Sequence, residues 1–231
     1  MNLAGIPQHI IQRVNFSFKC FYKTEDLQFY LESLKTISSN AQVSVHAYAL
    51  MGNHVHLLVT SNGNDNIAEM MVLLGRRYTH YFNQKYYRKG QLWRERIRPC
   101  LIDAENYLLA CQRYIELAPV RSGIVTHPAE YIWSSYSVNA LGEHQEFLKP
   151  HPVYMALGSN KAQRIEAYRQ MFHQDLEPGL VEKINEHANY GYCLGSEQFK
   201  LEIETILGRR EMPEGRGRPA EKLRLRYSYN Q

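Results

Sequence analysis

Residues 50–60 constrain the fold of this chain more than any other stretch, because apolar residues and two histidines alternate there. Successive side chains of a β-strand point to opposite faces, so His54 and His56 would share one face while Val55 points to the other. Residues 42–50 alternate in a similar way, and the short turn at 51–53 would fold the two strands into an antiparallel pair. The sequence therefore predicts a sheet that carries two imidazoles side by side.

Two neighbouring imidazoles can bind one metal ion together, as a bidentate ligand. Neutral imidazole binds divalent transition metals, and it tolerates harder ions when oxygen ligands and water complete the coordination shell. The same pattern is also compatible with two outward-facing polar side chains that bind nothing, and an isolated His-x-His favours that interpretation. The rest of the chain must decide between the two.

Hydrophobic periodicity predicts further elements on both sides of this strand pair. Residues 9–18 indicate a first strand, and residues 24–38 indicate a capped amphipathic helix. Residues 67–87 predict a long helix, and residues 91–102 predict another strand. Residues 104–117 predict a helix with Asp103 as its N-cap, ended by Pro119. We therefore expect an α+β fold: an antiparallel sheet with helices on one face.

The composition shifts beyond Gly142, and residues 144–152 are typical of a linker before an all-helical segment. Helices are predicted over 161–172 and 178–189, and a third after Ser196. Two short helices around the turn at 190–195 are compatible with a helix-turn-helix, although helical hairpins that only pack are commoner. We therefore divide the chain into a domain at 1–142 and a helical C-terminal DNA-binding segment with a basic tail at 143–231.

The formal net charge of +4 is unevenly distributed. Eight Lys and Arg residues and one acidic residue lie from Arg76 to Arg98, and seven basic and three acidic residues lie from Arg209 to Arg226. Two basic segments indicate a polyanionic partner, although a charged run is usually a solvated face. Arginines and aromatic residues interleave in the helix predicted over 67–87, as in grooves where bases stack and phosphates pair. Arg216 and Arg218 flank a glycine, as in arms that enter the minor groove; a basic tail would look the same.

Other features exclude whole classes of protein. The four cysteines form no C-x-x-C pair, which argues against a zinc knuckle and against a disulfide framework. No apolar run approaches the ~20 residues that a bilayer requires, and the first residues lack a basic-then-apolar export signal. We therefore expect a cytoplasmic protein with no membrane partner.

Four segments, taken together in this order and spacing, resemble the REP-associated tyrosine transposases. These segments are residues 47–59, 90–93, 107–117 and 119–123. That family comprises single-tyrosine HUH nucleases related to small insertion-sequence transposases, and the resemblance runs from Gly5 to about Leu141. It implies a ferredoxin-like palm in which the histidine strand lies centrally and the helix bearing Tyr114 packs near it.

The resemblance also implies a chemistry. His54 and His56 would hold Mg²⁺ or Mn²⁺, and Tyr114 would attack a scissile phosphorus to give a 5′-phosphotyrosine and a free 3′-hydroxyl. The protein would then nick and rejoin single-stranded DNA beside palindromic hairpins in the nucleoid, with contacts to duplex DNA through its C-terminal segment. The residues expected to bind DNA are Arg76, Arg77, Arg94, Arg96, Arg98, Arg121, Arg216 and Arg218.

This sequence departs from the family at the position one helical turn after Tyr114. Family members carry Asn or Gln there as a third metal ligand, whereas this chain has Ala118, whose methyl group cannot coordinate a metal. A weaker metal site is expected, since losing even an outer-shell partner typically costs ~10–100-fold in affinity or activity. Glu116 would face the wrong side of the helix, and Glu95 could replace the ligand only if its strand lay beside the site.

Two smaller departures are Val14, where relatives have Gly, and the segment 94–97, where relatives have Glu-Gly-Arg followed by an aromatic residue. The departures leave an alternative function open, that of a domesticated DNA-binding regulator with weak or no cleavage. The DNA sequence recognised and the oligomeric state do not follow from the sequence.

Overall fold

The computed structural model describes residues 3–14, 19–63, 66–94 and 97–208. Its centre is a four-stranded antiparallel sheet in the order β2-β3-β1-β4, with strands β1 (Gln8–Arg13), β2 (Val43–Leu50), β3 (His54–Ser61) and β4 (Cys100–Leu101). Helix α1 (Thr24–Asn40) joins β1 to β2, and α2 (Asn66–Lys85) follows β3. This order is that of the ferredoxin-like fold, so the expected α+β class and antiparallel sheet are confirmed.

The register of β3 decides which side chains share a face. β3 is an inner strand, and opposite His56 stand Ile11 of β1 and Ala49 of β2. Opposite His54 stands Arg13, at the end of β1. His54 and His56 therefore lie on one face of the sheet, while Val55 and Leu57 point to the other.

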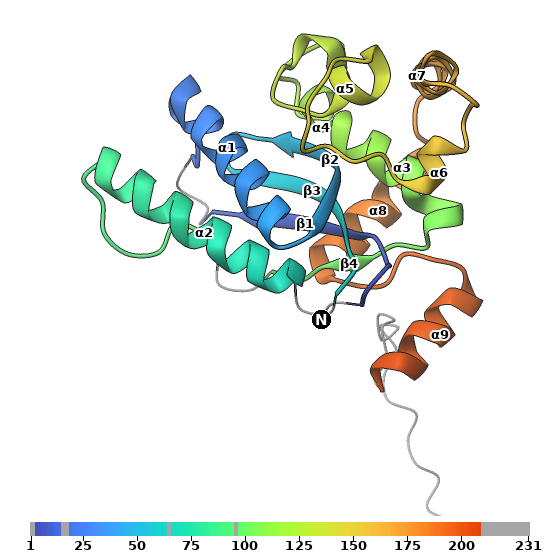
Figure 1. Ribbon diagram of the computed structural model, residues 1–231, viewed down its shortest axis with the longest axis horizontal. Helices are drawn as coiled ribbons and strands as arrows, with labels where there is room; N and C mark the ends of the chain where they lie inside the picture. Colours follow the sequence, from blue (N-terminus) through green and yellow to red (C-terminus); the bar gives the residue numbers. More distant parts are fainter. Residues whose placement is uncertain (1–2, 15–18, 64–65, 95–96, 209–231) are drawn as a thin grey trace, which may run out of the picture.

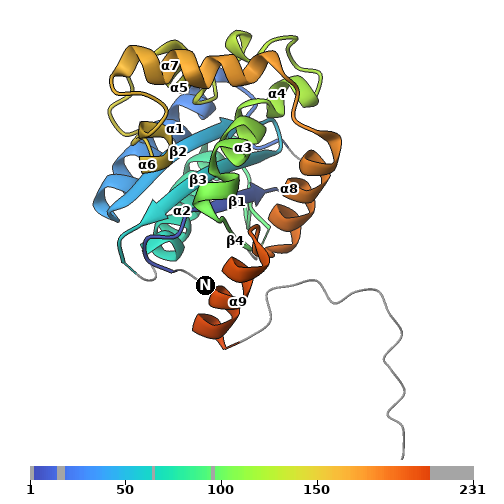
Figure 2. The same cartoon turned by 90° about the vertical axis from the view of Figure 1, so that its right-hand side faces the viewer.

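Helices cover both faces of the sheet, whereas the sequence had suggested one (Figures 1 and 2). Helices α1 and α2 pack together on the face of Val55 and Leu57, where most of the large apolar and aromatic side chains are buried. Helices α3 (Ala104–Glu116) and α8 (Pro178–Tyr190) pack on the face that carries the histidines. The histidines thus lie between the sheet and two helices that are distant from each other in the sequence.

The remaining elements surround α3 and extend the C-terminal end. They are the short helices α4 (Ala118–Arg121), α5 (Tyr136–Leu141) and α6 (Pro152–Met155), the helices α7 (Lys161–Gln170) and α9 (Glu197–Leu207), and the 3₁₀ turns η1 (Pro128–Glu130) and η2 (Met171–His173). Ser196 caps α9 as predicted, because its Oγ accepts from the Phe199 amide. No helix of the described residues is long and apolar enough to cross a membrane.

The strand predicted over 91–102 is much shorter in the structure. Among its described residues, only the two residues of β4 form a strand, and Trp93 makes a single bridge to Val14. Pro99, immediately before β4, has no amide hydrogen for a sheet hydrogen bond, so the strand cannot continue regularly through it. The first strand, predicted over 9–18, ends at Arg13, and residues 15–18 lie outside the described part of the chain.

Candidate active site

Three imidazoles form a connected cluster on the inner strands of the sheet. The Nε2 atoms of His54 and His56 lie 3.1 Å apart, and the Nδ1 atom of His56 lies 3.0 Å from Nε2 of His9 on β1. The Nδ1 atom of His54 lies 2.6 Å from Oδ1 of Asn53. Each of His54 and His56 therefore has one nitrogen held by a neighbour and turns its Nε2 toward the other.

All three imidazoles are neutral near pH 7. Burial, and after it the nearby cations Arg13 and Arg121, lowers the pKa of His54 to about 4 and that of His9 to about 3. Burial and the neighbouring imidazoles also hold the pKa of His56 well below its usual value. A neutral imidazole keeps a lone pair, which is the form that binds a metal.

Tyr114 of α3 lies against this cluster. Its ring is buried and meets the rings of His9 and His56 edge-on, at centroid distances of 5.9 and 6.0 Å. The guanidinium carbon of Arg121, on α4, stands 3.7 Å from the centre of the Tyr114 ring. The short α4 follows α3 after one residue, which brings Arg121 back over the tyrosine that precedes it by two turns.

Helix α8 completes the surroundings of the Tyr114 hydroxyl. That hydroxyl donates to Asn185 Oδ1 at 3.3 Å, and Asn189, one turn later on α8, donates from Nδ2 to the same oxygen at 2.9 Å. Arg13 of β1 donates to Asn189 Oδ1 at 2.6 Å. A chain of hydrogen bonds thus runs from the phenol through two amides to a guanidinium at the end of β1.

The positive charge of this region has no carboxylate partner within the described residues. Neither Arg13 nor Arg121 takes part in any of the ion pairs of that part of the chain. Burial lowers the pKa of both guanidiniums, yet both keep their charge at neutral pH because an arginine pKa starts so high. Two cations beside a phenol, with no internal anion, are suited to an external anion such as a phosphate.

His54 and His56 fit a divalent metal. Their Nε2 atoms converge, and each ring is oriented by a hydrogen bond at its Nδ1, as metal-bound histidines usually are. The described residues contain no group of three or more His, Cys, Asp or Glu side chains arranged to hold a metal ion. Oxygen ligands for such an ion would come from water, an amide or the substrate.

The position expected to supply a third ligand does not supply one. Ala118 is buried in the same apolar cluster as Tyr114. Glu116 faces away from the histidines, as its spacing on the helix indicated, and accepts from Ser135, Asn139 and Tyr168. Glu95 lies outside the described residues.

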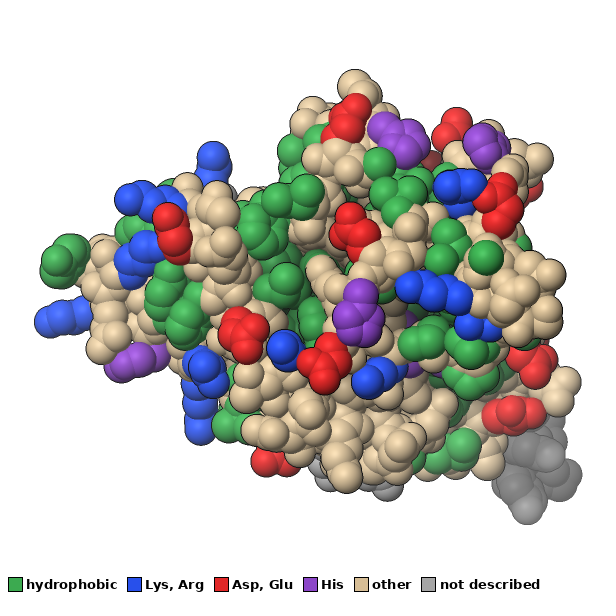
Figure 3. Space-filling view, turned by 45° about the horizontal axis from the view of Figure 1, so that its top comes forward, with side chains coloured by type: hydrophobic (Ala, Val, Ile, Leu, Met, Phe, Trp, Pro, Cys, Tyr) green, Lys and Arg blue, Asp and Glu red, His purple; other side chains and the backbone are tan. Residues whose placement is uncertain are grey.

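Only some of the predicted DNA-binding arginines lie near this cluster. Arg121 contacts Tyr114, while Arg94 and Arg98 line a hollow that also includes Arg13. Arg76 and Arg77 are exposed on α2, which covers the other face of the sheet, and Figure 3 shows Lys and Arg side chains gathered at the end of the molecule where α1 and α2 lie. Arg96, Arg216 and Arg218 lie outside the described residues.

Sequence reasoning missed His9, Arg13, Asn185 and Asn189. The sequence did contain a signal for His9 and Arg13. The two residues are four apart on a strand that pairs with β3, so their side chains point to the same face as the histidines of β3. Asn185 and Asn189 had none, since only the packing of α8 against the sheet and α3 brings them near Tyr114.

Comparisons with known proteins bear on the family and the fold of this chain. The model of a family described as "Transposase IS200 like" matches residues 3–117. The chain is similar in fold to a solved REP-associated tyrosine transposase bound to a REP hairpin, with a TM-score of 0.54 and 15% identity over 66% of this chain and 90% of the other. A putative transposase from Deinococcus radiodurans matches at a TM-score of 0.37 and 18% identity, over 50% of this chain and 93% of that one. No curated protein matches the chain.

Proposed function

Because residues 3–117 of this chain belong to the family of IS200-like transposases, we propose that the protein nicks and rejoins single-stranded DNA through Tyr114. Membership of the family indicates a DNA-processing transposase that transfers DNA strands. The proposal that Tyr114 is the nucleophile rests on one observation. Tyr114 lies between the imidazole cluster and Arg121. The structural neighbour was solved with a DNA hairpin, which supports a hairpin beside the cleavage site here as well.

In the proposed reaction, the Tyr114 oxygen attacks the phosphorus of one phosphodiester. The phenolic proton leaves as the P–O(Tyr) bond forms, and the bond from phosphorus to the 3′-oxygen breaks, so that a 3′-hydroxyl is released after it takes up a proton. The product is a 5′-phosphotyrosine. A phenolate is a better leaving group than an alkoxide, so a free 3′-hydroxyl can attack the linkage and rejoin the strand without ATP.

The residues around Tyr114 would assist this step by electrostatics and orientation. Arg121, above the ring, stabilises negative charge that develops on the phenol oxygen and on the phosphate. Asn185 Oδ1 accepts from the hydroxyl and fixes its direction before substrate enters. Arg13 lies on the other side of the Asn185–Asn189 pair and offers the phosphate a second cation.

His54 and His56 would hold the divalent ion, Mg²⁺ or Mn²⁺, through their Nε2 atoms. When bound, such an ion polarises a non-bridging phosphate oxygen. His9 would not bind the metal itself. Its contact with Nδ1 of His56 orients the His56 ring and leaves Nε2 of His56 for the metal.

The test is the covalent adduct. The purified protein is incubated with Mg²⁺ or Mn²⁺ and a single-stranded oligonucleotide that carries a hairpin, and denaturing electrophoresis reports protein linked to DNA. We expect an adduct in the native chain and none in Tyr114→Phe, because phenylalanine keeps the ring packing but has no nucleophile. An adduct that persists in Tyr114→Phe would show that another residue is the nucleophile.

One observation favours a second function, that of a DNA-binding regulator with weak or no cleavage. Ala118 is buried and carries no ligand atom at the position where relatives have one. The substitution Ala118→Asn distinguishes the two functions in the same assay. If the asparagine variant forms an adduct at least tenfold faster than a barely active native chain, the regulator is favoured; similar, substantial rates in both favour the transposase.

A further inference from the structure

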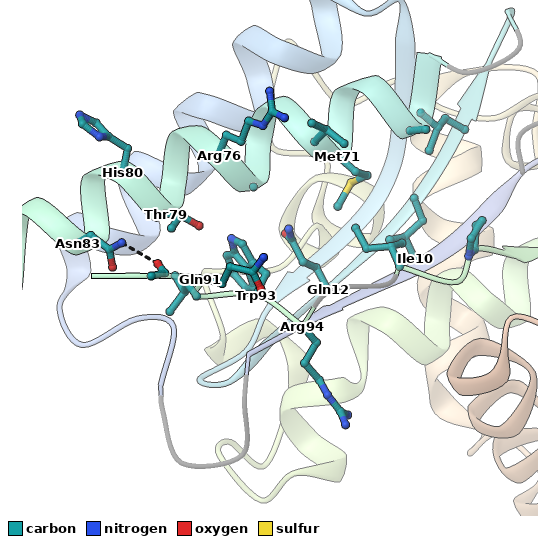
Figure 4. A pocket seen from close by; sticks show the side chains of 18 residues that line it. Ile10, Gln12, Met71, Arg76, Thr79, His80, Asn83, Gln91, Trp93 and Arg94 are labelled. Atoms are coloured by element: carbon teal, nitrogen blue, oxygen red, sulfur yellow. Dashed lines mark hydrogen bonds between the residues drawn. The ribbon is translucent and has the colours of Figure 1, made fainter. Parts of the chain in front are cut away.

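A hollow of about 790 Å³ lies on the face of the sheet opposite the histidines, between α2 and the residues at 90–94, 97 and 99. In Figure 4, Met71 and Thr79 extend from α2 toward Gln12 of β1 and Trp93. We call this hollow the α2 cleft. Its volume falls in the range of small-ligand sites, and it plays no part in the proposed chemistry at Tyr114.

The floor of the α2 cleft presents hydrogen-bond donors. Trp93 is only 8% exposed, and its buried Nε1 has no hydrogen-bond partner among the described residues. Gln12 accepts the Tyr30 hydroxyl at its Oε1, at 2.8 Å, which turns its Nε2 hydrogens the other way. An edge-on contact with Tyr30, at a centroid distance of 6.0 Å, and a tilted contact with Tyr78, at 5.6 Å, hold the Trp93 ring in place.

Gly75 lies directly beside these two donors. A Cβ at this position would lie 3.3 Å from Gln12 Nε2, 3.5 Å from Trp93 Cδ1 and 4.0 Å from Trp93 Nε1. Both donors therefore border the same point in space. Glycine weakens a helix interior relative to alanine, so its presence in the middle of α2 fits a position where open space is needed.

The charge of the cleft matches a nucleic acid. Arg76 and Arg94 are among its lining residues, and none of the described lining residues is acidic. Figure 4 shows Arg94 extending away from the cleft. Arg94 also lines a second hollow, of about 450 Å³, together with Arg13, Arg98 and Asn189, and no described residue of that hollow is acidic either.

The second hollow leads to the phenol. Asn189 contacts Arg13 and shares Asn185 Oδ1 with the Tyr114 hydroxyl. A strand that runs from the α2 cleft around the edge of the sheet would thus meet Arg94, Arg98 and Arg13 before it reaches Tyr114.

We propose that the α2 cleft binds one unpaired nucleobase of the same DNA strand whose phosphate reaches Tyr114, with its acceptor atoms on Trp93 Nε1 and Gln12 Nε2. This inference rests on the proposed function. Two adjacent N–H donors select a base edge with two adjacent acceptors. Guanine offers such an edge at O6 and N7, and an unpaired cytosine offers one at O2 and N3, whereas adenine has one acceptor and one donor at N7 and N6. The cleft is therefore a site that prefers guanine to adenine, and it sets which phosphate lies at Tyr114.

The experiment measures binding without cleavage. Trp133→Phe leaves Trp93 as the only tryptophan, so its fluorescence reports the cleft directly. The variant is titrated with an octamer of deoxyadenosine and with the same octamer carrying one central deoxyguanosine. We expect quenching by both and about tenfold tighter binding of the octamer with guanine.

Gly75→Ala and Gly179→Ala then form a matched pair in the Trp133→Phe background. Gly179 lies in α8, and a Cβ there would meet nothing within 4 Å, so this variant should keep the guanine preference. Gly75→Ala should lose most of that preference, because its Cβ would lie 3.3 Å from Gln12 Nε2. Trp93→Phe, measured by the anisotropy of a labelled octamer, removes the N–H while keeping an aromatic ring and should lose it as well.

Unchanged Trp93 fluorescence, or equal guanine preference in the Gly75→Ala and Gly179→Ala variants, overturns the α2 cleft as a base site. The adduct assay keeps the two proposals separable. An adduct without a Trp93 response leaves the transposase standing and removes the cleft. A Trp93 response that depends on Gly75, without any adduct, keeps the base site and removes the cleavage.

Discussion

The two faces of the sheet handle buried charges in opposite ways. On the α1 and α2 face, Asp26 is fully buried but accepts from Lys85, Tyr81, Tyr86 and two backbone amides. Burial alone would raise the pKa of this carboxyl, and these donors instead lower it to about 2. On the α3 and α8 face, three imidazoles and two guanidiniums stand together without a carboxylate from the described residues. On the α1 and α2 face, the buried charge is paired within the protein. On the α3 and α8 face, the charged side chains remain available for an external anion.

Because of this difference, some residues of β3 should contribute mainly to stability and others mainly to the proposed reaction. Adjacent residues of β3 point to opposite faces, so His56 belongs to the face of Tyr114 and Arg121, and Leu57 belongs to the aromatic core under α1 and α2. Substitutions at neighbouring positions should therefore have effects of different kinds, and three variants can break or sharpen the comparison.

His56→Ala should have the largest effect on activity. It removes one of two expected metal ligands and the partner of His9, and we expect the rate of adduct formation to fall at least ~100-fold. The melting temperature is measured beside the rate, because removal of this buried ring also removes its packing against His9 and Tyr114. An adduct rate within a few-fold of the native one would mean that the histidine face does not hold the metal.

Leu57→Ala should have the largest effect on stability. Leu57 is fully buried in the α1 and α2 core, and truncation of such a side chain costs about 2–5 kcal/mol of unfolding free energy. Urea unfolding measures that loss. Below the unfolding transition, the adduct rate should stay close to native; a loss as deep as that of His56→Ala would show that the two faces are coupled.

Glu116→Gln should have a smaller and pH-dependent effect. Burial raises the pKa of the Glu116 carboxyl to about 7, against hydrogen bonds from Ser135, Asn139 and Tyr168 that lower it. The folded state thus holds the proton more tightly than the unfolded chain, whose pKa is near 4.5. The stabilisation is complete below that value, falls as the pH rises toward about 7, and is gone above it.

Between pH 5 and pH 8 the native chain should therefore lose about 2 kcal/mol more unfolding free energy than Glu116→Gln, whose side chain cannot ionise. Urea unfolding at the two pH values tests this. The adduct rate should be nearly the same in both proteins, because Glu116 faces away from the histidines. Parallel pH profiles of stability would show that Glu116 is not the group that titrates.

The sequence could predict the elements whose periodicity is strong. The pair β2 and β3, the helices α1, α2, α3, α8 and α9, and the ferredoxin-like order all follow from residue patterns and from the family resemblance. The sequence could not predict that the strand expected over 91–102 is reduced to β4. The apolar residues there, Leu92 and Trp93, are buried in the core without forming a strand, and their pattern looks the same in both cases. Short elements such as α5 and α6 have too few turns to produce a clear period.

The candidate site was predictable in part. The sequence pointed to His54, His56 and Tyr114, and the structure brings their rings together, while their roles stay predictions until the adduct is measured. Arg121 was expected to bind DNA, but nothing in the sequence placed it over the Tyr114 ring. Asn185 was out of reach for sequence reasoning, since it lies 71 residues from its hydrogen-bond partner and only tertiary packing joins them.

The contact between Tyr114 and Asn185 has a consequence for protein engineering. The family match ends at residue 117, yet the phenol is held by an amide from α8, and Ile184 and Ala188 of the same helix close the apolar cluster beneath it. A shortened version cut near residue 142 would lack this cover. Grafting the recognition part of a relative onto this chain should therefore keep α8 with the catalytic half, or exchange both together.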